Sequence, residues 1–98
     1  MIYIIATIFI KPGSLEQVLP LAKTCIDATR QEEGCLSYDL HQSVTDENTL
    51  VFVERWKDQD AINVHFMEPH LTAWIEAGKP FITGKKVEII TPQEVKEI

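Results

Sequence analysis

The stretch from Glu54 to His70 concentrates more chemically capable side chains than any other part of the chain, because it holds two histidines, a tryptophan and an acid on a mostly apolar strand. An imidazole has an unperturbed pKa of about 6.5, so a histidine can accept and return a proton near neutral pH. We therefore take His65 and His70 as candidate catalytic bases. Glu54 is a candidate partner, because a buried carboxylate needs one and can orient a histidine.

Each of these residues also has a purely structural interpretation. His65 falls on the inward face of an expected helix, where a hydrogen-bonded histidine can simply line the core. His70 follows Pro69 at a helix start, where the helix dipole favours the neutral imidazole that a base requires, but a surface histidine fits equally well. Glu54 can instead form an ion pair across a dimer. The third histidine, His41, alternates with polar residues and is predicted to face solvent.

Four aromatic side chains are candidate substrate-binding residues. Trp56, Phe66 and Trp74 offer flat apolar surfaces, and the Tyr38 hydroxyl can donate to a substrate oxygen. Packing in the core is the alternative for all four.

Other catalytic chemistries find little support in the spacing of the residues. His65 and His70 are not one helical turn apart and Pro69 lies between them, so we predict no metal site. The chain has no glycine-rich loop that would cradle a phosphate, and no turn motif of a serine nucleophile.

Composition limits the class of protein. The chain has 98 residues, enough for one domain, which we assign to residues 1–98. Fifteen acids and nine bases give a net charge of −6, which disfavours nucleic acid and anionic membranes as partners. Two cysteines without a recognisable leader are typical of a reducing cytoplasm, and the apolar start of the chain is too short to cross a bilayer. We expect a cytoplasmic protein.

Hydrophobic patterning predicts four strands, at Ile2–Ile10, Cys35–Ser43, Leu50–Trp56 and Val87–Thr91. The lysine-rich residues 79–86 are expected to form a loop, because they include Pro80 and Gly84. Residues 92–98 are expected to be a polar tail.

Helices are expected in the two long gaps between strands. The first should start with a capping box of Ser14 and Gln17, kink at Pro20 and end at Gly34 in a left-handed cap. Asp58 should cap the second, and Pro69 should start a further short helix over residues 70–77.

The resulting order βαββαβ is that of the ferredoxin-like α+β fold, with an antiparallel sheet. Helices of this fold cover one face of the sheet. Both faces of the first strand are apolar here, and an uncovered apolar face is commonly an interface. We therefore predict a homodimer that packs sheet face against sheet face.

Several short motifs resemble the antibiotic biosynthesis monooxygenase family. They are Glu54-Arg55-Trp56, Ala61 with His65, Pro69-His70, and upstream Lys11-Pro12-Gly13 and residues 33–38. The resemblance implies a dimeric α+β barrel and, in many members, oxygen chemistry without metal, flavin or haem. Glu54, Trp56, His65 and His70 match the family pattern, whereas the aromatic-rich helix motif of its haem-degrading branch is absent.

Cofactor-free oxygenation requires a substrate that is itself the reductant and a base that deprotonates it. The resemblance and the histidines together predict a cofactor-independent monooxygenase that combines a small reduced quinone or phenol with dioxygen. One alternative is an isomerase of a small hydroxylated carbonyl compound. The other is a non-catalytic dimeric module that binds a small ligand.

Overall fold

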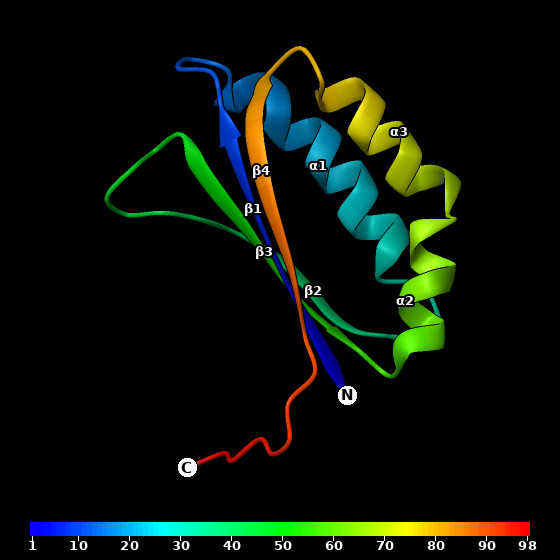
Figure 1. Cartoon of the computed structure of the whole chain (residues 1–98). Helices are drawn as coiled ribbons and strands as arrows, with labels where there is room; N and C mark the ends of the chain where they lie inside the picture. Colours follow the sequence, from blue (N-terminus) through cyan, green and yellow to red (C-terminus); the bar gives the residue numbers. More distant parts are fainter.

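Strand β1 (Ile2–Ile10) lies inside a four-stranded antiparallel sheet of order β2-β3-β1-β4, in the computed structural model that describes residues 1–98. The other strands are β2 (Cys35–Gln42), β3 (Thr49–Trp56) and β4 (Ile82–Ile90). Helices α1 (Leu15–Thr29), α2 (Gln59–Phe66) and α3 (Pro69–Gly78) all lie on one side of the sheet (Figure 1). This confirms the predicted α+β, ferredoxin-like architecture.

Alternation along β3 directs its acid into the interior. Leu50, Phe52, Glu54 and Trp56 are all buried against the helices, as the sequence predicts. The core around them takes further apolar residues from β1, α1, α2 and α3: Ile4, Ile8, Ile10, Val18, Ala22, Cys25, Ile62 and Trp74. Glu54 therefore sits in an environment built to exclude water.

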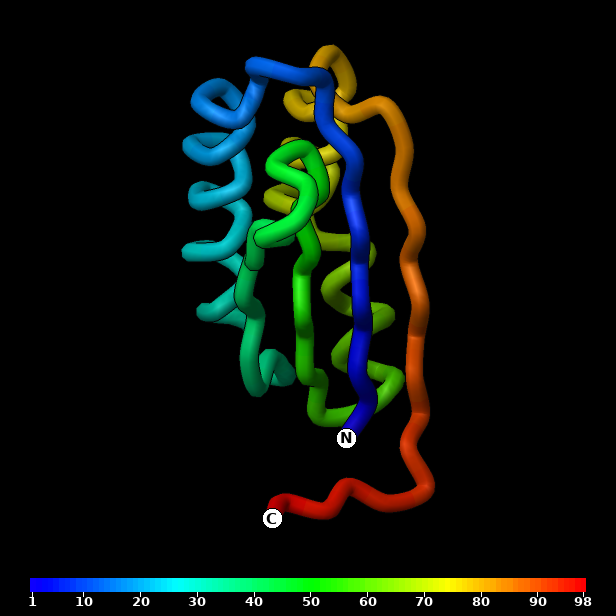
Figure 2. The backbone as a smooth tube through the Cα atoms, turned by 90° about the vertical axis from the view of Figure 1, so that its left-hand side faces the viewer, coloured from blue at the N-terminus to red at the C-terminus, as the bar shows by residue number.

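The other face of the sheet has no helix over it, as Figure 2 shows from that side. Ile5 and Val53 lie opposite each other on this face and are only partly buried. Arg55 lies over the ring of Tyr3, 5.1 Å from its centroid. Within a single chain, the helices thus cover one face of the sheet and leave the other face uncovered, as the sequence predicts.

Two expected features of the first helix are wrong. Helix α1 ends at Thr29, and Gly34 does not adopt a positive φ. A side chain at Gly34 would instead collide with Ala61, so this glycine lets α2 approach the start of β2. Ser14 stands at the N-terminus of α1 but makes no side-chain cap; its hydroxyl donates to the Lys11 carbonyl.

Strand β4 starts at Ile82, five residues earlier than predicted. Residues 82–86 pair with β1 although they are rich in lysine, because an edge strand can keep charged side chains in solvent. A register shift between Phe9 and Ile10 accommodates the start of the pairing. The expected loop over residues 79–86 is therefore mostly strand, and this places Lys85 on the sheet.

The break between α2 and α3 follows the predicted chemistry. The Asp58 carboxylate accepts a hydrogen bond from the Ala61 backbone N–H at 2.9 Å, which caps α2. Pro69 occupies the first turn of α3, where its missing N–H costs nothing. None of the three helices combines the length and apolar character needed to span a bilayer.

Candidate active site

A single carboxylate oxygen joins the two candidate histidines. Oε2 of Glu32 lies 2.7 Å from Nδ1 of His65 and 2.8 Å from Nε2 of His70. Both distances are short and are typical of charge-assisted hydrogen bonds. All three side chains are largely enclosed, with exposed fractions of 9% for Glu32, 2% for His65 and 19% for His70.

Three different segments bring these groups together. His65 is on α2 one turn after the buried Ile62, so it points inward. Pro69 starts α3 in a new direction and places His70 in its first turn. Glu32 comes from the turn between α1 and β2, where its backbone N–H donates to the Thr29 carbonyl.

These hydrogen bonds define the protonation pattern of His65. A carboxylate oxygen accepts, so Nδ1 of His65 carries the proton and Nε2 keeps its lone pair. Nε2 has no hydrogen-bond partner within the chain, and Glu32 Oε1 is the only fully enclosed side-chain oxygen or nitrogen without one. Burial lowers the pKa of His65, with Glu32 acting in the opposite direction. His65 is therefore a neutral imidazole with a free basic nitrogen.

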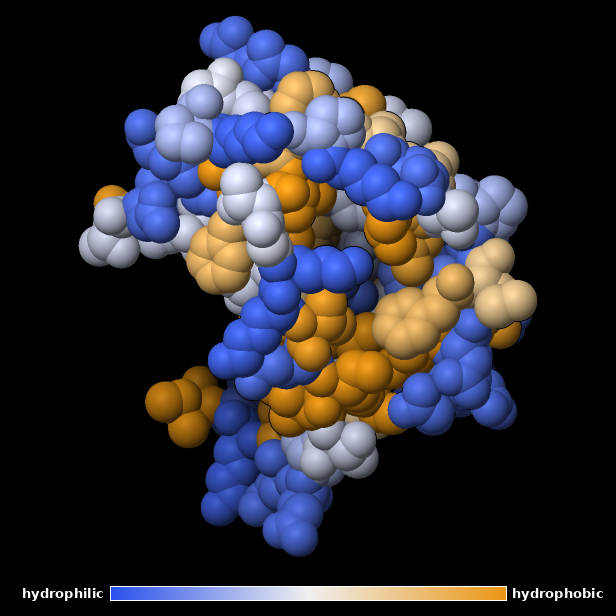
Figure 3. Space-filling model, turned by 45° about the horizontal axis from the view of Figure 1, so that its top comes forward, coloured by the Kyte–Doolittle hydropathy of each residue, from blue (hydrophilic) through white to orange (hydrophobic).

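An apolar cavity of about 280 Å³ lies beside this histidine, between the sheet and the helices α2 and α3. Figure 3 shows a hollow bordered by hydrophobic side chains, with hydrophilic ones at its rim. The volume is close to the lower end of the range for small-molecule sites. Ten of the thirteen lining residues are hydrophobic: Ile4, Ala6, Ile8, Tyr38, Phe52, Phe66, Leu71, Trp74, Ile75 and Val87.

Glu54 supplies a second acid–base group to the same cavity. Its Oε1 accepts a hydrogen bond from the Trp56 indole N–H at 2.9 Å. Burial raises the pKa of Glu54 to about 7, although the Trp56 hydrogen bond acts against this. The carboxyl group thus titrates near neutral pH, which is the range that suits proton transfer.

This raised pKa predicts how stability depends on pH. Native Glu54 keeps its proton up to about pH 7, whereas the unfolded chain releases it near the ordinary value of 4.5. The native state binds more protons in that window, so this residue makes the free energy of unfolding fall by about 3 kcal/mol as pH rises from 4.5 to 7. The contribution is present below pH 4.5 and is lost above pH 7.

Denaturant unfolding of the wild type and of Glu54→Gln across this pH range measures the effect. We expect the difference between the two proteins to change by about 3 kcal/mol, since glutamine does not titrate. A constant difference from pH 4.5 to 8 would show that Glu54 keeps an ordinary pKa in the folded protein.

Known proteins share this architecture over almost the whole chain. The sequence model of the antibiotic biosynthesis monooxygenase family matches residues 1–77. The chain belongs to this family. A solved structure described as an antibiotic biosynthesis monooxygenase is 33% identical and has a TM-score of 0.89, with 96% of this chain and 100% of that chain covered.

Relatives of this chain occur in several bacteria. YcnE of Bacillus subtilis, a monooxygenase candidate by name, is 36% identical over 86% of this chain and 88% of its own length. YgiN of Escherichia coli, a quinol monooxygenase candidate by name, is 26% identical over 94% of this chain and 98% of its own length. The chain spans only 59% of an uncharacterised Synechocystis protein to which it is 32% identical.

Only some of the site residues predicted from the sequence lie on the cavity wall. His65, Glu54, Tyr38, Phe66 and Trp74 line the cavity, whereas Trp56 and His70 do not. Trp56 is fully buried beneath the cavity and packs on the His65 ring, with centroids 4.5 Å apart. His70 reaches the site through Glu32 alone.

The carboxylate that contacts the histidines is not Glu54, the candidate partner offered by the sequence. Glu54 makes no hydrogen bond or ion pair with a histidine, and Glu32 takes that position instead. Glu32 has no periodic signal in the sequence, because it lies in a turn beside a second glutamate. A search for an acid near the end of the first helix would have offered Glu32 and Glu33 as equal candidates.

Donor atoms of Glu32, His65 and His70 lie within 4.8 Å of one another, so this group could also hold a metal ion. Sequence spacing alone argued against such a convergence of the two histidines. The N–O distances of 2.7 and 2.8 Å are those of hydrogen bonds. As it stands, the cluster is arranged as a hydrogen-bond network.

Proposed function

We propose that the protein is a cofactor-independent monooxygenase that combines a small reduced quinone or related phenol with dioxygen, with His65 as the base. The observation that carries the proposal is the free Nε2 of His65 at an apolar cavity, with Nδ1 held by Glu32. Membership of the family, and the names of its relatives, support a monooxygenase-type activity.

The chemistry follows from these groups. His65 Nε2 removes a phenolic proton from the hydroquinone, and the resulting anion gives one electron to dioxygen. The superoxide and the ring radical combine at a ring carbon to form a peroxide. Return of the proton from His65 to the outer peroxide oxygen, with loss of the ring hydrogen as a proton, breaks the O–O bond. The products are a hydroxylated quinone and one water.

Glu54 can assist these steps from the other wall of the cavity. Because burial raises the pKa of Glu54 to about 7, its carboxyl group can carry a proton near neutral pH and donate a hydrogen bond to a substrate or peroxide oxygen. Tyr38 contributes its ring to the cavity wall, whereas its hydroxyl lies 4.0 Å from Cys25 Sγ on α1. Trp74 and Phe66 add apolar surface to the cavity wall, against which an aromatic ring can pack.

Dioxygen uptake tests the proposal directly. We expect protein treated with a chelator to accelerate oxygen consumption above autoxidation for at least one member of a panel of hydroquinones and anthrones. One mole of oxygen should be consumed per mole of hydroxylated product. Uptake that disappears on chelation and returns with added metal would contradict a cofactor-free reaction.

An isomerase of a small hydroxylated carbonyl compound is the second candidate. The presence of two acid–base groups, His65 and Glu54, at one cavity favours it, since such a reaction moves a proton between carbon and oxygen. An isomerase consumes no oxygen. Absence of uptake across the panel, together with exchange of substrate hydrogen for deuterium in heavy water, would replace the first proposal by this one.

We further propose that two chains form a homodimer through the uncovered sheet face. Ile5, Val51 and Val53 leave an apolar strip there, between charged residues on the outer strands. Light scattering at micromolar concentration should give twice the mass of one chain. A single-chain mass would contradict this assembly.

We assign the protein to the cytoplasm, where free thiols such as Cys25 and Cys35 stay reduced.

A further inference from the structure

Lys85 is the only lysine or arginine on the wall of the cavity. It lies on β4 directly opposite Ile8 of β1, and so on the face of the sheet that the helices cover. A second cavity of about 280 Å³ lies between α3 and β4 and shares four lining residues with the first: Ile8, Trp74, Ile75 and Lys85. Lys85 therefore stands where the two cavities meet.

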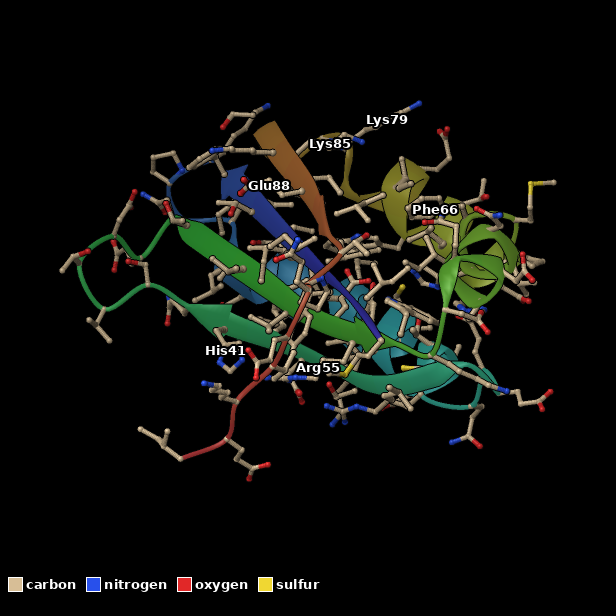
Figure 4. The ribbon with its side chains drawn as sticks, turned by 60° about the horizontal axis from the view of Figure 1, so that its bottom comes forward. His41, Arg55, Phe66, Lys79, Lys85 and Glu88 are labelled. Atoms are coloured by element: carbon tan, nitrogen blue, oxygen red, sulfur yellow. The ribbon has the colours of Figure 1, made fainter.

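The charge of Lys85 is not neutralised within the chain. Neighbouring lysines have acidic partners: Lys86 lies 3.9 Å from Glu88, and Lys79 lies 2.8 Å from Glu76. Lys85 takes part in none of the seven ion pairs of the chain. Figure 4 shows Lys85 on the side of β4 next to Lys79 and α3, with Glu88 on the opposite side of the strand.

The strand register places this cation far from the acid–base groups. Glu54 pairs with Ile4, which pairs with Ile89, whereas Lys85 lies across from Ile8. Glu54 and Lys85 are therefore two strands and four residues apart, about 17 Å between their Cα atoms by standard sheet spacings. Because both side chains extend into the cavity, the distance between the Glu54 carboxyl group and the Lys85 ammonium group is shorter than the distance between their Cα atoms. This shorter distance suits a ligand with a body of two or three fused rings better than a ligand with a single ring.

We propose that Lys85 binds a carboxylate on the substrate, so that the preferred substrate is an acidic, fused-ring hydroquinone or phenol. This inference rests on the proposed function for the identity of the reacting group, but the anion site itself does not. The ring body would lie against Trp74 and Ile75. The hydroxyl group to be deprotonated would then lie at the inner end, beside His65 and Glu54.

The position of Lys85 explains how an acidic protein could select an acidic ligand. The net charge of −6 repels anions at long range, so a carboxylate gains affinity only where a local cation outweighs that field. Lys85 is exposed at the cavity wall, so its charge contributes a modest attraction for an anion beside the apolar residues Ile8 and Trp74. A neutral ligand of the same shape would lack this contribution.

Calorimetric titration with two unreactive probes tests the site without any turnover. The probes are 2-naphthoate and 2-naphthamide, which share a fused-ring body and differ in charge. We expect the wild type to bind the acid about tenfold more tightly than the amide, and Lys85→Met to bind the two equally. Lys86→Met is the matched control, since Lys86 lies on the opposite face and should keep the full preference for the acid.

Several outcomes would overturn the proposal: equal affinity of the wild type for acid and amide, no binding of either probe, or an equal loss of preference in both lysine variants. A preference for the acid that survives in Lys85→Met but disappears in His65→Asn would place the carboxylate at the inner end and also refute it. Failure of oxygen uptake would leave the binding result intact, so the two proposals fail separately.

Where turnover is measured, Lys85→Met should raise KM for carboxylated naphthohydroquinones about tenfold and leave kcat unchanged. Lys85 is remote from His65, so it contributes equally to the bound substrate and the transition state. A fall in kcat with unchanged KM would instead assign Lys85 to the chemical step.

Discussion

Replacing His65 by asparagine should lower kcat/KM about 10³-fold and leave the chain folded. General base catalysis contributes roughly 10²- to 10⁴-fold, and His65 is the only neutral imidazole on the cavity wall. The asparagine amide N–H can replace Nδ1 as donor to Glu32, so the variant removes the basic Nε2 while it keeps the buried hydrogen bond. Steady-state oxygen uptake and circular dichroism measure the two parts of this prediction.

His65→Ala and His70→Ala provide the matching comparison. The alanine variant of His65 also loses the hydrogen bond to Glu32, but it leaves space in which added imidazole can restore part of the activity. His70 contacts Glu32 and does not line the cavity, so its removal should cost about tenfold. Equal, full activity of His65→Asn and His70→Ala would remove histidine base catalysis from the mechanism.

Alternation of apolar residues was sufficient to predict β1 and the buried row of β3. Glu54 stood out because it interrupted an apolar row, and it does line the cavity. The start of β4 was missed for the opposite reason, because an edge strand can carry lysines that resemble a loop. That error concealed Lys85, which is both outside the expected strand and part of the cavity wall.

Glu32 could not be recognised by pattern, because its role depends on contacts between residues distant in the chain. It lies 33 residues from His65 and 38 from His70. Its position is determined by where α1 ends and by the close approach of α2 at Gly34, and both differ from the expected helix cap. Motifs near Glu54 and His65 thus pointed to residues that line one cavity, whereas the hydrogen-bond network of Glu32 required the folded chain.

Replacing Glu32 by glutamine should also lower kcat/KM, by about 10³-fold, although Glu32 is expected never to touch the substrate. Two ring N–H groups now share one carboxylate oxygen. A glutamine carbonyl oxygen in the shared position would still accept from both rings but carry no charge, whereas an amide nitrogen in that position can donate only to a ring nitrogen that accepts. If that ring is His65, its proton moves to Nε2 and the base is lost, as when an amide replaces the carboxylate of a catalytic triad.

The pH profile distinguishes this positioning role from a loss of packing. The Glu32 carboxylate raises the pKa of His65 against the effect of burial. Removing its charge should therefore lower the pKa of His65, and the acidic limb of log kcat/KM should move to lower pH. A variant that is merely less stable would lose activity without any shift of this limb.

Two further variants make the test specific to the hydrogen-bonded carboxylate. Glu33→Gln changes the neighbouring glutamate, which makes no contact with either histidine, and should retain full activity. Glu32→Asp keeps the charge and should restore part of the activity, together with the wild-type pH profile. If Glu32→Gln were fully active, the proton on Nδ1 of His65 would not depend on this carboxylate. The base would then have to be sought elsewhere on the cavity wall, with Glu54 the remaining titrating group there.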